Sequence, residues 1–101
     1  MSLAGSNRNV RAREFRELFA KLPRRVQSLA RATFRLFLRN PRHDSLRLHQ
    51  LSDSGKGRHR PGTWSVSITM KYRALYFIED GTNVWYWIGS HNDCENFTGK
   101  K

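Results

Sequence analysis

The spacing of apolar residues changes once along the chain, and this change limits the fold more than any other feature. Before Asn40-Pro41 apolar residues recur at helical spacing, and after Arg42 they alternate with polar residues as in a strand. The two periods bury side chains in different geometries, so helices come first and a sheet follows. This order predicts an α+β domain in which two N-terminal helices cover one face of a small, mostly antiparallel four-stranded sheet.

Two helices are predicted before residue 41. The first spans 12–21 and has apolar residues at the spacing i, i+3, i+4 and i+7, namely Phe15, Leu18, Phe19 and Leu22. The second begins at Pro23, which is tolerated in a first helical turn, and ends before Pro41. Residues 1–9 have no periodic apolar signal, so we expect a flexible leader at 1–9, one domain at 10–97 and a flexible tail at 98–101.

The second half predicts four strands. A short strand is expected at 46–51, and the alternation from Trp64 to Met70 predicts a half-buried strand with one polar face. Apolar runs at 72–78 and 83–89 flank Asp80-Gly81, a dipeptide typical of tight hairpins. The loop at 52–62 is rich in glycine, serine and basic residues. Its basic residues are Lys56, Arg58 and Arg60. They either reach toward an RNA backbone or are simply solvated, and both interpretations stay open.

The chain is strongly basic, with 19 Lys and Arg against 8 Asp and Glu and a net charge of +11. A polyanion is favoured as partner because each neutralised phosphate releases counterions, so nucleic acid comes first and an acidic protein second. For any single arginine, a solvated helix face remains the simpler explanation. One cysteine and no stretch long and apolar enough for a signal peptide or a bilayer span predict a cytoplasmic protein with no membrane partner.

Polar residues distant in sequence are predicted to meet at one end of the sheet. If the hairpin turn is centred on Asp80-Gly81, antiparallel pairing places Arg73 roughly opposite Ile88. The residues after Ile88 then leave the sheet beside Arg73, and a tight turn near Met70 brings the end of the preceding strand there too. The residues expected at this end are Ser67, Thr69, Lys71, Arg73, His91, Asp93 and Glu95.

This set of residues has the groups that RNA cleavage by the ribose 2′-hydroxyl requires. His91 suits proton transfer because its ordinary pKa lies near neutrality, Arg73 presents a planar donor fork to a phosphate, and Asp93 would orient His91. A structural ion pair of Arg73 is the alternative. His91 and Cys94 lack the further ligands of a zinc site, and no glycine-rich phosphate loop occurs, so we expect no metal and no cofactor.

From Leu22 to Phe97 the sequence resembles the RelE/ParE toxin superfamily. The resemblance is carried by the order of five stretches, LPRRVQSLA, RNP, SLRLHQL, SVSITMKYRALYF and VWYWIGSHND. It implies a bacterial toxin of a type II toxin-antitoxin system that cuts mRNA at the ribosome on a metal-free fold. The implied partners are a cognate antitoxin, mRNA and ribosomal RNA.

The resemblance also implies roles for single residues. Arg73 matches an arginine that contacts the scissile phosphate, His91 a catalytic residue after the last strand, and Phe97 a terminal aromatic that stacks on a base. His49 resembles a histidine of the YafQ-like branch, although a plain surface histidine is equally compatible. The expected substrate-binding residues are Phe97, Lys71, Ser67, His49, Arg58 and Arg60.

Three positions depart from the family pattern. Ser65 and Ser67 stand where relatives often have Lys or Arg, and Cys94 stands where many have Tyr. Charge stabilisation would then be weaker or come from Lys71 or the loop arginines. Three functions therefore stay open: a ribosome-dependent mRNA endoribonuclease, a ParE-like inhibitor of DNA gyrase, and a catalytically silent relative that binds nucleic acid or an antitoxin.

The rings of residues 85–87 are expected to alternate between the faces of the last strand. Either Tyr86 faces the helices with Val84 and Ile88, or Trp85 does so with Trp87. The set left outside would offer a groove for an antitoxin or a platform for base stacking.

Overall fold

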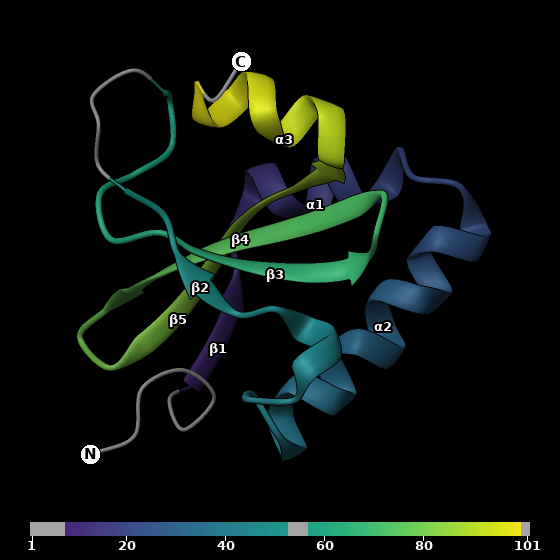
Figure 1. Cartoon of the computed structure of the whole chain (residues 1–101), viewed down its shortest axis with the longest axis horizontal. Coiled ribbons are helices and arrows are strands. Elements are labelled where there is room, and N and C mark those ends of the chain that lie inside the picture. Colours follow the sequence, from purple (N-terminus) through teal and green to yellow (C-terminus); the bar gives the residue numbers. More distant parts are fainter. Residues whose placement is uncertain (1–7, 53–56, 100–101) are drawn as a thin grey trace.

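The computed structural model describes residues 8–52 and 57–99, which form one mixed sheet covered by helices (Figure 1). The strand order is β1-β5-β4-β3-β2, with β3, β4 and β5 in an antiparallel meander and β1 parallel to β5. The strands are β1 Arg8–Arg11, β2 His49–Gln50, β3 Trp64–Thr69, β4 Tyr72–Glu79 and β5 Thr82–Ser90. The predicted α+β class is confirmed, with five strands in place of four.

The two predicted helices are present as α1 Arg13–Ala20 and α2 Arg24–Arg39. A third helix, α3 His91–Thr98, was not predicted; it packs on the opposite face of the sheet through Cys94 and Phe97. Ser90 caps α3 because its hydroxyl accepts a hydrogen bond from the backbone N–H of Asp93 (3.0 Å), and Gly99 ends it with a positive φ of 73°. None of the described helices is long and apolar enough to cross a membrane.

Three residues expected in the flexible ends, Arg8, Asn9 and Thr98, belong to regular elements. Residues 8 and 9 belong to β1, where the Asn9 side-chain oxygen accepts hydrogen bonds from Trp85 Nε1 (2.9 Å) and Asn83 Nδ2 (3.1 Å). An edge strand held by backbone pairing and an asparagine needs no apolar alternation, so the pattern did not reveal it. At the other end, Thr98 is buried in α3 and its hydroxyl donates to the Cys94 carbonyl (2.9 Å).

The strand expected at 46–51 shrinks to the two residues of β2. A short 3-10 helix at Asp44–Leu46 precedes it, and Arg47 adopts a left-handed conformation with φ of 47°, which breaks the extended chain. Leu46 is thereby turned into the core, where it is fully buried. β3 was expected to be half-buried with one polar face; that face carries Ser65 and Ser67, but both serines are buried.

A bulge in β5 decides which rings face which layer. The β4–β5 register shifts between Leu75 and Tyr76, which leaves Tyr86 without a direct partner. Trp85 and Ile88 therefore share the face under α1 and α2, while Tyr86 and Trp87 both lie on the other face. Neither of the two predicted sets is right, and all three rings at 85–87 are buried.

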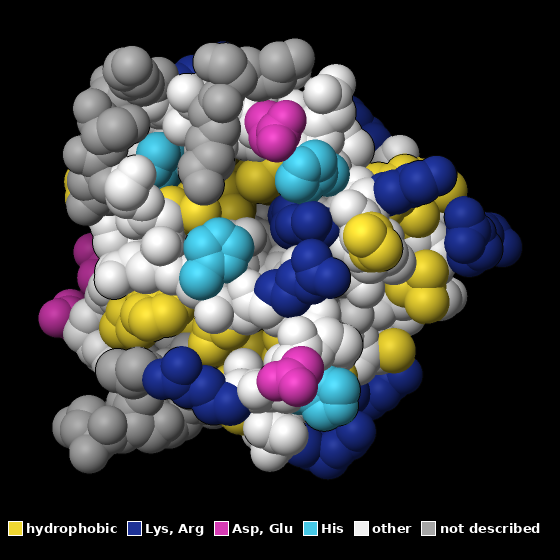
Figure 2. All heavy atoms as spheres, viewed as in Figure 1, with side chains coloured by type: hydrophobic (Ala, Val, Ile, Leu, Met, Phe, Trp, Pro, Cys, Tyr) yellow, Lys and Arg dark blue, Asp and Glu magenta, His cyan; other side chains and the backbone are white. Residues whose placement is uncertain are grey.

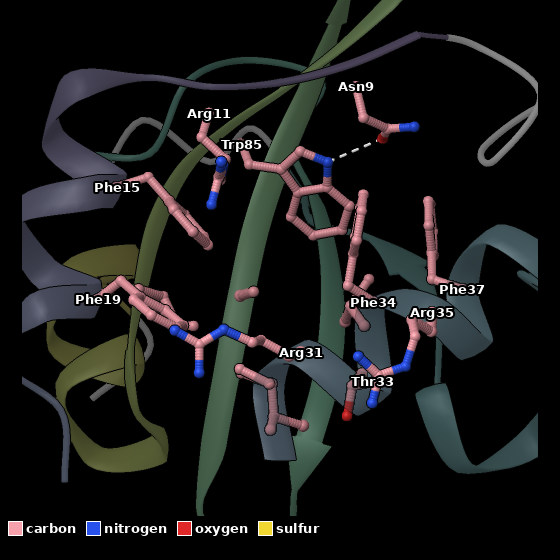
Figure 3. Close-up of a pocket in the computed structure, with 15 residues that line it drawn as sticks. Asn9, Arg11, Phe15, Phe19, Arg31, Thr33, Phe34, Arg35, Phe37 and Trp85 are labelled. Atoms are coloured by element: carbon pink, nitrogen blue, oxygen red, sulfur yellow. Dashed lines mark hydrogen bonds between the residues drawn. The ribbon is translucent and has the colours of Figure 1, made fainter. Parts of the chain in front are cut away.

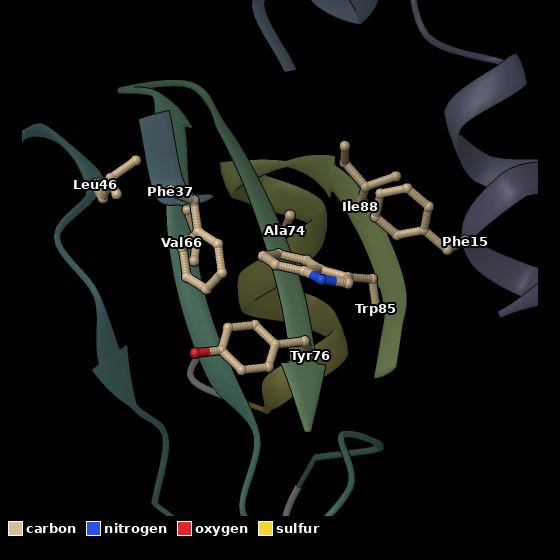
Figure 4. Packing of buried hydrophobic residues seen from close by; sticks show 8 residues of the cluster. All are labelled: Phe15, Phe37, Leu46, Val66, Ala74, Tyr76, Trp85 and Ile88. Atoms are coloured by element: carbon tan, nitrogen blue, oxygen red, sulfur yellow. The ribbon is translucent and has the colours of Figure 1, made fainter. Parts of the chain in front are cut away.

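Trp85 is the centre of the core between the sheet and the first two helices (Figure 4). Its ring lies 4.6 Å from that of Tyr76, 5.2 Å from Phe37 and 6.5 Å from Phe15, measured between centroids. These separations are typical of attractive edge and tilted ring contacts. One residue of the sheet thus joins both helices.

Replacing Asn9 tests whether β1 is part of the fold. Asn9→Ala removes the acceptor of the Trp85 indole N–H, and an unsatisfied buried donor costs about 1–3 kcal/mol. We expect urea unfolding to show a loss of that size. Arg8→Ala, an exposed position in the same strand, is the control, and equal small losses for the two variants would contradict an integral β1.

Candidate active site

His91 and Lys71 meet where β4 begins and β5 ends. Tyr72 pairs with Ser90 across the two strands, and the backbone N–H of His91 donates to the Lys71 carbonyl (2.6 Å). Both side chains are exposed, and a shallow hollow lies between them. The structure therefore brings together the two ends of the predicted cluster.

The partner of His91 is Glu95. His91 Nε2 lies 3.1 Å from Glu95 Oε2, one helical turn away on α3, with side chains 47% and 39% exposed. Asp93 was expected to orient His91, and this is corrected: residues i and i+4 share a helix face, whereas i and i+2 do not. Asp93 instead takes part in the cap of α3 through its backbone N–H.

Arg73 lies on the α3 side of the sheet, between Ser67 of β3 and Gly89 of β5. The bulge in β5 explains why its neighbour is Gly89 and not the expected Ile88. Arg73 Nη1 donates to the carbonyls of Thr69 (2.6 Å) and Tyr72 (3.0 Å), which fixes the guanidinium at the end of the sheet. In the described part of the chain it forms no ion pair, so the predicted structural ion pair is absent there.

The surroundings of Arg73 shift its pKa in both directions. Partial burial lowers its pKa, Cys94 and Glu95 act in the opposite direction, and the positive charge of Arg47 lowers it further. Arginine starts so far above neutrality that Arg73 remains cationic. The electrostatic neighbours of Arg73 therefore include one residue, Arg47, that the sequence analysis did not select.

Arg47 and His49 extend the basic surface across β2. His49 Nδ1 donates to the Arg47 carbonyl (2.8 Å). Across the sheet, His49 pairs with Ser65, and Ser65 pairs with Leu75. Leu75 is on the same side of the sheet as Arg73. Figure 2 shows histidines beside Lys and Arg side chains near the middle of the visible face. The sequence signal for Arg47 was its position two residues before His49, on the same side of an expected strand.

Phe97 is half-buried and packs against its neighbours in the structure. Its ring stacks on Trp87 at a centroid distance of 5.3 Å, and the guanidinium of Arg58 lies over it at 5.6 Å. The Arg58 backbone N–H also donates to the Phe97 carbonyl (2.7 Å). Phe97 therefore belongs to the packing between α3, the sheet and the loop that precedes β3.

Arg58 lies against Phe97 near the C-terminal end of α3, and Arg60 lies against Phe77 of β4 and Tyr86 of β5. The Arg60 guanidinium lies 4.7 Å from the Phe77 ring centre, and its backbone N–H donates to the Tyr86 hydroxyl (2.9 Å). Burial raises the pKa of Tyr86, while its hydrogen bonds with Thr63 and Arg60 act against this. Lys56 lies outside the described residues.

The structure therefore divides the predicted site into two groups. Arg73, His91 and Lys71 lie at the end of β4 and β5, with Arg73 half-buried and the other two exposed. His49 is exposed on β2, and Ser67 is beside Arg73 but buried. Phe97 and the loop arginines form a separate, packed group. Among the described residues, no cluster of three His, Cys, Asp or Glu side chains could hold a metal ion.

No protein-family profile and no curated protein sequence matches the chain. Solved structures do match. YafQ from E. coli strain BL21(DE3) superposes with a TM-score of 0.67 at 14% identity, covering 88% of this chain and 98% of that chain. The toxin-antitoxin complex RelBE2 from Mycobacterium tuberculosis gives 0.57 at 24% identity, covering 84% and 98%. The chain has the fold of RelE-like toxins.

A third solved structure agrees. HP0894 from Helicobacter pylori, a conserved hypothetical protein, superposes with a TM-score of 0.61 at 16% identity, covering 85% of this chain and 96% of that chain. The RelE-like fold thus spans nearly the whole length of each relative. The resemblance seen in the sequence is confirmed at the level of the fold.

The contact between Glu95 and His91 can be tested without an activity assay. Because Nε2 of His91 faces the Glu95 carboxylate, Glu95→Gln should change the ring ¹⁵N chemical shifts and tautomer balance of His91. Asp93→Asn is the matched control, two residues along the same helix, and should leave these shifts nearly unchanged. A larger change of these shifts in Asp93→Asn than in Glu95→Gln would show that Asp93 is the residue that orients His91.

Proposed function

We propose that this RelE-like protein is the toxin of a type II toxin-antitoxin system and an mRNA endoribonuclease that acts at the ribosome. The observation that carries the proposal is that exposed His91 and Lys71 lie at the same end of the sheet as the half-buried Arg73, which feels the charge of Arg47. It combines a proton-transfer group with fixed cations on a fold shared with YafQ and the RelBE2 toxin. Fold likeness supports the toxin role, and the side chains support the chemistry.

The proposed reaction uses the ribose 2′-hydroxyl as nucleophile. Its proton passes to a base, its oxygen attacks the adjacent phosphorus, and the bond to the 5′-oxygen breaks as that oxygen receives a proton. The products are a 2′,3′-cyclic phosphate and a 5′-hydroxyl. His91 fills one of the two proton-transfer roles, and Arg73 stabilises the charge that develops on the phosphorane.

Relatives often have Lys or Arg at the positions of Ser65 and Ser67. Arg47 and Lys71 are proposed to supply that positive charge here. Both serines are buried, so a basic residue at either position would need a different local packing. Arg47, which follows the 3-10 helix Asp44–Leu46, acts electrostatically on Arg73, and Lys71 lies beside His91. In this protein the cations that face the phosphate are therefore proposed to come from the strand ends rather than from β3.

The basic surface of α2 is proposed to bind ribosomal RNA. Its arginines recur every three or four residues, which places them along one side of the helix: Arg31, Arg35 and Arg39. A net charge of +11 supports strong, salt-dependent affinity for RNA. This role places the protein in the cytoplasm, where mRNA and ribosomes are found.

An antitoxin is the second proposed partner. RelBE2, one of the solved structures with this fold, is a toxin-antitoxin complex. The excess of positive charge favours an acidic antitoxin, which would compete with RNA. A ParE-like action on DNA gyrase is the alternative that the nuclease assay must separate.

Primer extension on translated mRNA tests the nuclease proposal. The wild-type protein should cut within the ribosomal A site, and His91→Ala and Arg73→Ala should reduce cleavage by about 100-fold or more, as expected for lost acid-base or charge stabilisation. His43→Ala, an exposed histidine that bonds Ser45, is the matched control and should cleave normally. Intact mRNA together with blocked gyrase supercoiling would sink the proposal in favour of the ParE-like alternative.

A further inference from the structure

The C-terminal turn of α3 is completed by residues outside the helix. A helix leaves its last four carbonyls without partners inside the helix. In α3 the Phe97 carbonyl accepts a hydrogen bond from the backbone N–H of Arg58 (2.7 Å). The last turn of α3 has no basic residue of its own, and the Arg58 guanidinium lies over the Phe97 ring at 5.6 Å, near the negative end of the helix dipole. Arg58 therefore closes the end of α3 with both its backbone and its side chain.

Gly57 lets the chain approach α3 this closely. A Cβ atom at position 57 would collide with the backbone carbonyl of Thr98, the last residue of α3. The glycines with positive φ lie elsewhere in the described chain, so the close approach and not the backbone conformation requires glycine here. Any larger residue at this position would push Arg58 away from the helix.

Tyr86 fixes the other end of the same segment to the sheet. Thr63 Oγ1 donates its one proton to the Arg60 carbonyl (2.6 Å), so the Tyr86 hydroxyl is the donor in its contact with Thr63 Oγ1 (2.7 Å). The Tyr86 hydroxyl also accepts a hydrogen bond from the backbone N–H of Arg60 (2.9 Å). Residues 57–63 therefore form a bridge that is fixed to α3 at one end and to β5 at the other.

The helix that this bridge closes is too short to be stable alone. It has eight residues, and isolated helices shorter than about 12–15 residues are marginal in water. Ser90 caps its first turn, whereas Glu95 belongs to its last turn, where the Glu95 carbonyl accepts a hydrogen bond from the backbone N–H of Gly99. If the last turn unwinds, the Glu95 carboxylate moves away from His91.

We propose that Arg58 and Gly57 are positioning residues for His91. By closing the last turn of α3 from outside, they keep the Glu95 carboxylate 3.1 Å from His91 Nε2. The inference rests on the proposed function, in which His91 transfers a proton. The charge of Arg58 alone would also fit an RNA phosphate, but its backbone hydrogen bond to Phe97 and the fit of Gly57 against α3 serve the helix.

The ring ¹⁵N chemical shifts of His91 test the positioning without any substrate. Arg58→Gln removes the cation over Phe97, and Gly57→Ala adds one methyl group while leaving every charge in place. Both variants should move the His91 shifts toward those of Glu95→Gln. In the Glu95→Gln background, Arg58→Gln should add little further change, because the contact that it supports is already lost.

Arg31 provides the matched control. Its guanidinium lies over the Phe19 ring at 5.1 Å, which is the same kind of contact on the opposite face of the sheet (Figure 3). Arg31→Gln should therefore leave the His91 shifts unchanged. Circular dichroism checks that each variant is folded, and because Arg58 is exposed, Arg58→Gln serves as the test if Gly57→Ala fails to fold.

Cleavage kinetics separate positioning from RNA contact. Arg58→Gln and Gly57→Ala should lower kcat about tenfold, because a proton-transfer group is displaced, and should change the KM for programmed ribosomes less than about twofold. Arg31 lies on the helix proposed to bind ribosomal RNA, so Arg31→Gln should instead raise KM. It should also reduce the salt dependence of RNA binding by roughly the 0.7–0.9 expected for one phosphate contact.

Two outcomes would overturn the inference. One is that the His91 shifts stay unchanged in both Arg58→Gln and Gly57→Ala. The other is a raised KM with unchanged kcat in Arg58→Gln, which would make Arg58 an RNA contact. The shifts are measured without RNA, so a protein that shows the expected shifts and cuts no RNA would refute the nuclease proposal and support the positioning of His91.

Discussion

One extra residue in β5 determines which side chains face each side of the sheet. The bulge at Tyr86 lets Trp85 face the first two helices while Tyr86 and Trp87 face α3, so each layer receives large rings. It also shifts the β4–β5 register by one position, which places Arg73 beside Gly89. Without the shift, the same strand would present different side chains to both the core and the candidate site.

The change of apolar period predicted the first two helices, the meander and the hairpin turn, because these depend on local spacing and turn chemistry. Asp80 and Gly81 both have positive φ, as a tight turn of this kind requires. The bulge was beyond prediction, since three consecutive rings fit either face equally well. β1 was missed because a strand of four residues with one apolar side chain, Val10, has no pattern to detect.

The candidate site was predictable in position and less so in detail. Hairpin geometry brought Arg73 and His91 to the same end of the sheet, as expected. The pairing of His91 with Glu95 depends on α3, whose weak apolar spacing concealed a helix that Ser90 and Gly99 delimit. The base-stacking role of Phe97 came from the family resemblance, and its packing on Trp87 could not be foreseen without that helix.

The central claim is that the residues around His91 and Arg73 cleave RNA through the ribose 2′-hydroxyl. The most direct measurement is the end-group chemistry of a cut transcript, with and without a single 2′-deoxynucleotide at the cleaved position. The account predicts a 2′,3′-cyclic phosphate and a 5′-hydroxyl on the products, and no cleavage at the deoxy position. Cleavage that persists at the deoxy position, or products with a 3′-hydroxyl and a 5′-phosphate, would contradict it.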